Sequence, residues 1–164
     1  MYSKLFGTIF ILLMLSTASA NAQCAASGSI DISIFKPTAV SSFTPTNPGR
    51  YAVDGNFGTY WQSSGGNFQW LVVDMGREYG LTELAGIWNG SQFPKIGEVD
   101  ASADATRWDG MFEIGGLTSF DVHFPTTTGE SATKLYRYVR VALLATESGS
   151  YALNELKVCG FVRN

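Results

Sequence analysis

Apolar and polar residues alternate along several short stretches of the chain, as in strands with one buried face. Ile30, Ile32 and Ile34 show the pattern first. Turn-forming residues separate the stretches at intervals of about 8–12 residues, a spacing typical of all-β sandwiches. The only helical signal is a single turn over 47–52. Further strands are expected over 39–43, 71–76, 81–88, 96–103, 111–114, 119–124, 136–143 and 153–161. The pattern therefore predicts one all-β domain, an antiparallel β-sandwich or jelly roll, over residues 24–162.

Large aromatic residues at the strand ends are candidates for the core. Trp61, Trp70 and Trp108 each stand where an expected strand begins or ends among apolar partners, so we expect all three to be buried. In the strand over 136–143, Tyr138 and its apolar neighbours are expected to form one core-facing set.

The first 22 residues have the pattern of a secretory signal peptide. Lys4 gives a positive start, residues 6–15 are apolar, and Ala20-Asn21-Ala22 fits a cleavage site between small residues. The segment is too short for a membrane span. We expect residues 1–22 to be removed and the secreted, extracellular domain to comprise residues 23–164.

The chain has two cysteines, Cys24 and Cys159. Cys24 follows the cleavage site, so a lipidated cysteine is an alternative, but Gln23 stands where lipid attachment usually needs a small residue. Lipidation would also leave Cys159 without a partner in an oxidising compartment. A Cys24–Cys159 disulfide would join the two ends of the domain and contribute up to about 5 kcal/mol.

The net charge of −3 argues against a polyanionic partner. Removing Lys4 makes it −4, and the remaining Lys and Arg residues are scattered. We expect no nucleic-acid partner and no general attraction to anionic membranes.

An ordered series of motifs resembles the discoidin family, also called the coagulation-factor 5/8 type C domain. The matching segments are KPTAVSS (36–42), AVDGN (52–56) with Thr59 and Trp61, WLVVDMG (70–76), residues 99–108, YVRV (138–141) and NELKV (154–158). The resemblance implies a galactose-binding-like jelly roll with an end-to-end disulfide, to which Cys24 and Cys159 correspond. It also implies that loops at one end bind sugars, anionic phospholipid headgroups, collagen or other proteins.

A structural Ca²⁺ is part of what the resemblance implies, because many sugar-binding relatives carry one at this loop. Calcium takes six to eight oxygen ligands. Carried over to this sequence, the ligands would be the Asp54 and Glu155 carboxylates, Thr59, and backbone carbonyls. The carbonyls would come from Tyr51, Asn56 and Asn154. The alternative is that Asp54-Gly55-Asn56 is only a turn stabilised by the Asp54 carboxylate.

The expected ligand site lies in the loops 44–50, 88–93 and 147–151. Aromatic faces that stack on sugars and polar groups that bind hydroxyls are available there: Arg50, Trp88, Asn89, Gln92, Phe93 and Tyr151. Core burial is an equal expectation for Trp88. Asn89-Gly90-Ser91 is either a glycosylation sequon or a favoured turn, and we favour the turn.

Other functions find less support. Loop 44–50 lacks the exposed apolar tip of phospholipid-binding relatives, so membrane insertion is not expected. The single histidine, His123, lacks the Arg-x-Asp segment of fucose-binding relatives, and it is expected on a strand surface. With no second histidine and no nucleophile elbow, we do not expect an enzyme.

The sequence thus predicts a secreted module that binds carbohydrate or a glycoprotein, with homo-oligomers adding avidity. The alternatives are an extracellular adhesion module that binds a protein and a peripheral binder of anionic phospholipid.

Overall fold

All strand pairs among the described residues are antiparallel. The computed structural model describes residues 24–124 and 134–162, so the expected signal peptide lies outside the described residues. One 3₁₀ helix, η1 (Gly49–Val53), is described. The strands are β1 (Ile30–Asp31), β2 (Thr38–Val40), β3 (Trp61–Gln62), β4 (Gln69–Trp88), β5 (Ile96–Ser102), β6 (Asp109–Ile114), β7 (Ser119–His123), β8 (Tyr136–Ala145) and β9 (Ala152–Phe161).

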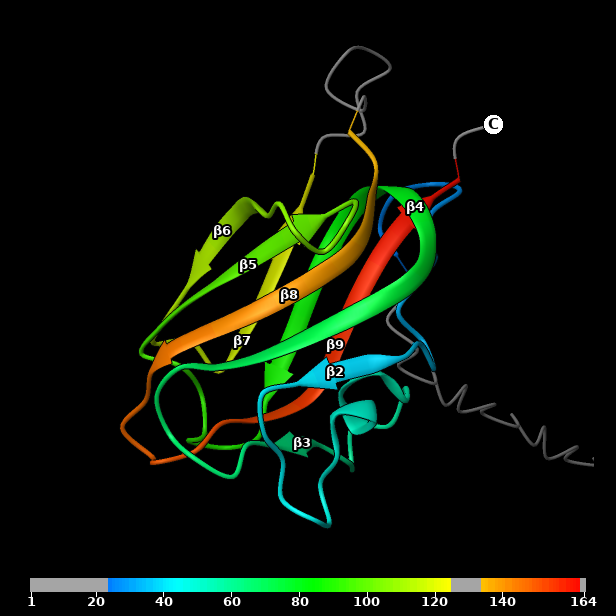
Figure 1. The fold of residues 1–164 in the computed structure, drawn as a ribbon. Coiled ribbons are helices and arrows are strands. Elements are labelled where there is room, and N and C mark those ends of the chain that lie inside the picture. Colours follow the sequence, from blue (N-terminus) through cyan, green and yellow to red (C-terminus); the bar gives the residue numbers. More distant parts are fainter. Residues whose placement is uncertain (1–23, 125–133, 163–164) are drawn as a thin grey trace, which may run out of the picture.

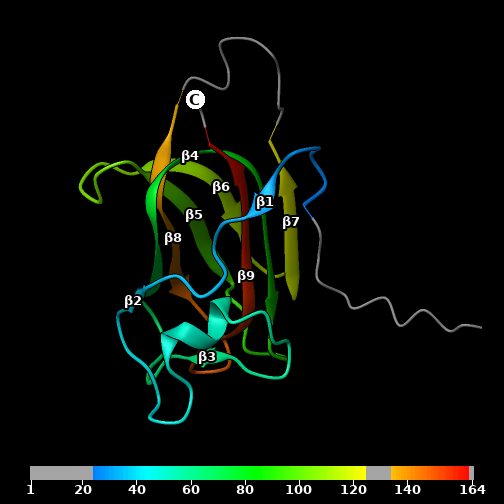
Figure 2. The same ribbon diagram turned by 90° about the vertical axis from the view of Figure 1, so that its right-hand side faces the viewer.

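Two sheets face each other and share β4 (Figures 1 and 2). In one sheet, β2 and β8 pair with the first half of β4, and β5 and β6 follow β8. In the other, β7 and β9 pair with the second half of β4, and β9 also pairs with β1 and β3. This arrangement confirms the predicted antiparallel β-sandwich.

Strand β4 passes from one sheet into the other through a bend. Its pairing with β8 shifts between Asp74 and Tyr79, and Gly76 within this stretch has a φ of +84°. Glycine adopts positive φ without a steric penalty, so it lets the strand turn here. The sequence predicted two strands, 71–76 and 81–88, because the charged residues at the bend interrupt the apolar pattern.

Buried apolar residues of β4, β8 and β9 form much of the core between the sheets. Trp61 is fully buried as predicted. The prediction of burial is wrong for Trp70, which is 37% exposed, and for Trp108, which is partly exposed. Along β4 the inward side chains are those of Leu71, Val73 and Met75, so Trp70 points outward.

The prediction that Tyr138 faces the core is also wrong. Val139, Val141 and Leu143 are fully buried, whereas Tyr138 is only partly buried. Successive residues of a strand face opposite sides, so Tyr138 belongs to the outer face together with Arg140.

A disulfide joins Cys24 to Cys159, as predicted. This bond uses the thiol that a lipidated Cys24 would need. Asp31 of β1 lies opposite Cys159 of β9, so the start of the described chain is held against the last strand. The predicted single turn of helix near residues 47–52 corresponds to η1.

Candidate functional site

Four loops gather at one end of the sandwich, the lower end in Figure 1. They cover residues 41–48, 63–68, 89–95 and 146–151, and we call them the loop end. The backbone N–H of Thr44 donates to the carbonyl of Gln62 over 2.9 Å, which ties the first loop to β3. Gly66 lies so close to Gly149 that an added Cβ would be 3.4 Å from its carbonyl oxygen. The loops therefore support one another.

The polar residues predicted to bind a ligand lie on or beside the loop end. Arg50 is exposed, and its guanidinium lies 4.9 Å from the centre of the Tyr51 ring. The Gln92 side-chain amide donates to the Ser150 hydroxyl over 2.6 Å. Asn89 is partly buried and begins a turn in which Gln92 N–H donates to the Asn89 carbonyl. The expected Asn-Gly turn is thus present, with Gly90 at a φ of +58°.

The aromatic residues predicted for the ligand site are less accessible. Tyr151 has no exposed surface and Trp88 is 4% exposed. A ring without an open face cannot stack on a sugar, so this placement contradicts the expected role of both. Phe93 is partly buried and packs against the core. Gly149 and Ser150 beside Tyr151 suggested an open loop, but the tyrosine itself is fully buried.

The aromatic residues that are exposed at the loop end are two phenylalanines, which the sequence prediction missed. Phe68 is 76% exposed and Phe43 is 51% exposed. Phe68 has a φ of +60°, a left-handed conformation that costs roughly 1–2 kcal/mol for a residue with a side chain. Ser42 Oγ donates to Gln69 Oε1 over 2.5 Å, which joins the segments carrying the two rings. The Ser-Ser-Gly-Gly-Asn run before Phe68 was the available signal, because it predicts an exposed loop.

An oxygen-rich loop follows η1. Thr59 Oγ1 lies 2.8 Å from Asp54 Oδ2 and 2.8 Å from the Asn56 carbonyl oxygen. The Asn154 side-chain amide donates to the carbonyls of Phe57 and Thr59 over 3.0 and 3.1 Å. The amide thereby fixes the loop against β9. The structure thus brings Asp54, Asn56 and Thr59 together as the sequence predicted, with Asn154 as a brace.

Glu155 extends from β9 toward this loop. It is 6% exposed, and its Oε1 accepts a hydrogen bond from Gly55 N–H over 3.3 Å. Oε2 is buried and has no hydrogen-bond partner among the described residues. Burial raises the pKa of Glu155 to about 7, and the negative charges of Asp54 and Asp31 add to this effect. An unpartnered carboxylate oxygen beside a second carboxylate is a suitable place for a cation.

A second acidic cluster lies on the outer side of the sheet that contains β7 and β9. His123 is 3.4 Å from Asp121 and 3.7 Å from Glu83, and the oxygen and nitrogen atoms of the three residues lie within 4.8 Å of one another. The ammonium of Lys157 pairs with Glu83, and the Ala25 N–H donates to the other Glu83 oxygen. The Lys157 ammonium offsets the charge of Glu83, and each carboxylate oxygen has a donor without a metal.

The sequence of the domain matches a known family. A sequence model of the F5/8 type C domain matches residues 36–156. The chain belongs to the F5/8 type C family. The expected discoidin resemblance is thereby confirmed. No curated protein sequence matches this F5/8 type C domain significantly.

Solved structures similar to this F5/8 type C domain include three modules from bacteria. Chitosan-binding module 2 of a chitosanase/glucanase from Paenibacillus sp. IK-5, in complex with chitotriose, is 26% identical with a TM-score of 0.68. The alignment covers 78% of this chain and 98% of that one. The family 32 CBM of C. perfringens NanJ in complex with galactose is 18% identical with a TM-score of 0.68, covering 80% and 98%. A fucose-binding module of Streptococcus pneumoniae is 22% identical with a TM-score of 0.65, covering 81% and 96%.

Among the described residues of this F5/8 type C domain, no helix has the length and apolar character needed to cross a membrane.

Proposed function

We propose that this F5/8 type C domain is a carbohydrate-binding module whose ligand site is the loop end. The similar structures support this proposal, because they are binding modules in complex with or named for chitotriose, galactose and fucose. Each aligned segment covers nearly the whole of the similar chain, so the likeness extends over the complete module. These relatives also support a binding role rather than a catalytic one.

The observation that carries the proposal is the exposed ring of Phe68 in the loop 63–68. Phe68 is 76% exposed, so its ring is open to a ligand at the loop end. An aromatic ring can stack on the apolar C–H face of a sugar. Arg50, Asn89 and Gln92 on the surrounding segments provide donors and acceptors for hydroxyl groups.

We propose that a structural Ca²⁺ binds in the oxygen-rich loop after η1. Asp54, Asn56, Thr59 and Glu155 supply the oxygens that Ca²⁺ prefers, with the carbonyls of Tyr51 and Asn154 as further candidates. The buried and unpartnered Oε2 of Glu155 fits such an ion. The ion would neutralise two neighbouring carboxylates and fix the loop between η1 and β3. Its role would be structural, because it would hold a loop in place rather than take part in chemistry.

We also propose that the domain is secreted. The first 22 residues have the pattern of a signal peptide, and the Cys24–Cys159 disulfide fits an oxidising compartment. Outside the cell, homo-oligomers or clustered ligands would strengthen a weak single sugar site, and a glycoprotein partner would present such clusters.

One observation favours a second function, the binding of an anionic phospholipid surface. Phe43 and Phe68 are both exposed on neighbouring segments of the loop end. Exposed apolar side chains rimmed by polar residues are typical of membrane-interaction sites as well as ligand sites. A protein-binding adhesion role would use the same surface.

A glycan array probed with the disulfide-bonded protein tests the first function. Phe68→Ala should lower the affinity for any bound glycan about tenfold, which corresponds to the loss of one aromatic anchor. Phe35→Ala is the matched control, because Phe35 is also a phenylalanine, is 77% exposed and has a φ of +55°. A blank array from folded protein, together with sedimentation on phosphatidylserine vesicles, would instead support the lipid function.

A further inference from the structure

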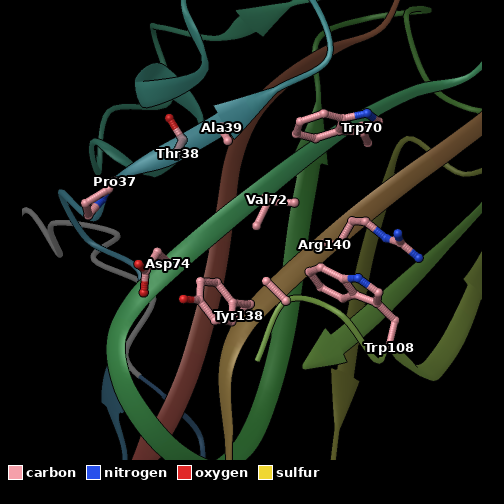
Figure 3. A pocket seen from close by; sticks show the side chains of 10 residues that line it. Pro37, Thr38, Ala39, Trp70, Val72, Asp74, Trp108, Tyr138 and Arg140 are labelled. Atoms are coloured by element: carbon pink, nitrogen blue, oxygen red, sulfur yellow. The ribbon is translucent and has the colours of Figure 1, made fainter. Parts of the chain in front are cut away.

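A groove of about 530 Å³ runs along the outer face of the sheet that contains β2, β4 and β8. Figure 3 shows Trp70, Val72 and Asp74 along its floor, with β2 on one side and the loop bearing Trp108 on the other. The volume is within the range of about 300–1,000 Å³ that is usual for small-molecule sites. The floor from Trp70 to Asp74 spans about 13 Å at the rise of a β-strand.

The Trp108 side of the groove is held rigidly. The guanidinium of Arg140 lies 4.4 Å from the centre of the Trp108 ring. The loop before Trp108 is fixed by Asp104, whose Oδ1 accepts hydrogen bonds from the N–H groups of Thr106 and Arg107 over 2.8 and 2.9 Å. These contacts hold the indole at the wall of the groove before any ligand arrives, which lowers the entropic cost of binding.

The charged groups of the groove are paired within the protein. Arg140 donates to Asp100 Oδ2 over 2.8 and 2.6 Å. Asp74 accepts two hydrogen bonds of 2.8 Å from Arg137. The groove therefore presents no unpaired charge to a ligand. A carboxylate has about four acceptor positions, so Asp74 can still accept a hydrogen bond from a hydroxyl group.

One end of the groove, at Trp70, lies close to the loop end. Phe68 precedes Trp70 by two residues, and Ser41 Oγ accepts a hydrogen bond from Trp70 N–H over 3.0 Å where the loop 41–48 begins. A ligand that contacts Phe68 can therefore extend along β4 toward Asp74. Such a ligand must be long, because the floor of the groove is longer than one sugar ring.

We propose that the groove binds the internal rings of a neutral glycan chain, whose end or branch is held at the loop end. Two features select this ligand class. The indoles of Trp70 and Trp108 offer apolar faces for the C–H surfaces of pyranose rings. The paired charges match a chain without charge of its own, and Asp74 and Tyr138 bind its hydroxyl groups. This inference rests on the proposed carbohydrate function. It adds that the ligand is a chain of several sugar rings rather than a single sugar.

Titration calorimetry with the full disulfide-bonded protein tests the groove. The probes are cellohexaose, xylohexaose and N-acetylchitohexaose, each compared with its disaccharide. At least one hexasaccharide should bind about tenfold more tightly than its disaccharide, which corresponds to about 1.4 kcal/mol. Trp70→Ala and Trp108→Ala should each remove this difference. Phe68→Ala should weaken the binding of both lengths.

Tryptophan fluorescence gives a readout specific to the groove. Trp61 and Trp88 are buried, so acrylamide quenches mainly the fluorescence of Trp70 and Trp108. A hexasaccharide bound in the groove should reduce this quenching. The protection should vanish in the Trp70→Phe/Trp108→Phe double variant, which keeps an aromatic ring at each position. Circular dichroism and the urea unfolding midpoint establish that each variant is folded, and Ile30→Ala, at an exposed residue of β1, is the control.

Two results overturn the proposal in distinguishable ways. If saccharides bind and Phe68→Ala weakens them, but folded Trp70 and Trp108 variants bind as the wild type does, the groove proposal alone is wrong. If no saccharide of either length binds to the folded protein, the proposed carbohydrate function is wrong and the groove proposal is wrong with it.

Discussion

Arg140 joins the Asp100 carboxylate to the face of the Trp108 ring. Its Nη2 lies 2.6 Å from Asp100 Oδ2, and its guanidinium carbon lies 4.4 Å from the ring centre. Asp100 is 3% exposed and stands opposite Arg140 in the pairing of β5 with β8. The pair thus fixes a partly exposed indole to a buried acidic residue of the neighbouring strand.

Arg140→Ala should destabilise the domain, because it leaves the buried Asp100 carboxylate without its cation. The expected loss of unfolding free energy is about 3 kcal/mol, the lower end for a broken buried pair, since the Arg140 side chain is 29% exposed. Urea unfolding measures this loss. The double variant Asp100→Ala/Arg140→Ala should recover part of it, and a double variant as unstable as the sum of the two singles would contradict a direct pairing.

Calcium should stabilise the domain if the cage around Asp54 binds it. At a calcium concentration one hundred times Kd, the free energy of unfolding should rise by about 2.7 kcal/mol relative to chelator. Asp54→Asn and Glu155→Gln should each abolish this rise. Glu113→Gln, at an exposed residue of β6, is the matched control and should keep it. Equal thermal midpoints of the wild-type protein in calcium and in chelator would contradict the metal site.

Acid should weaken the domain through Glu83. Burial alone would raise the pKa of Glu83, but the Ala25 N–H, the Lys157 ammonium and His123 together lower it below its usual value of 4.5. A carboxylate with a lowered pKa stabilises the fold above its unfolded-state pKa, and this contribution is lost as pH falls through the folded-state pKa. The urea midpoint of the wild-type protein should therefore fall below about pH 4.5.

Glu83→Gln separates this effect from those of other acids. The variant should be less stable than the wild type at pH 7, and the difference should shrink as pH falls. The pKa values of Asp74 and Asp109 are also lowered, by Arg137 and Lys134 respectively, so both proteins should still lose stability in acid. A constant difference between pH 7 and pH 3 would show that Glu83 is not the titrating group.

Removal of the disulfide should cost stability because the bond spans 135 residues of sequence. Long loops lose the most conformational entropy when closed, and the expected loss is about 2–5 kcal/mol. The Cys24→Ala/Cys159→Ala variant measured by urea unfolding checks this value. Reduction of the wild-type protein with dithiothreitol should give a similar loss, and a loss below about 1 kcal/mol would contradict the entropic role.

The sequence predicts most strands because period-two alternation is local. It misses β3, since two residues carry no periodicity, and it divides β4 where Arg77 and Glu78 interrupt the apolar pattern at the bend. Tyr151 and Trp70 show the limit more sharply. The exposure of Trp70 depends on which face of β4 meets the second sheet, and the burial of Tyr151 depends on how its loop packs against the domain. Neighbouring residues alone determine neither.

The oxygen-rich loop was easier to predict than the groove. Asp54, Asn56 and Thr59 lie within six residues, so their proximity follows from a single turn. The groove combines Trp70 of β4, Trp108 of a distant loop and Arg140 of β8, which meet only through sheet register. No local pattern links these three residues.

The disulfide also determines how the domain can be presented to a surface. In the pairing of β4 with β9, Leu153 stands opposite Trp88 near the loop end. Cys159 stands opposite Glu83, six residues further along β9 and away from the loop end. Cys24 is fixed at the same place, so both described ends of the chain leave the sandwich away from the loops. If either end is tethered to a cell, a bead or another module, the loop end points outward, and many copies on one support would share a single orientation.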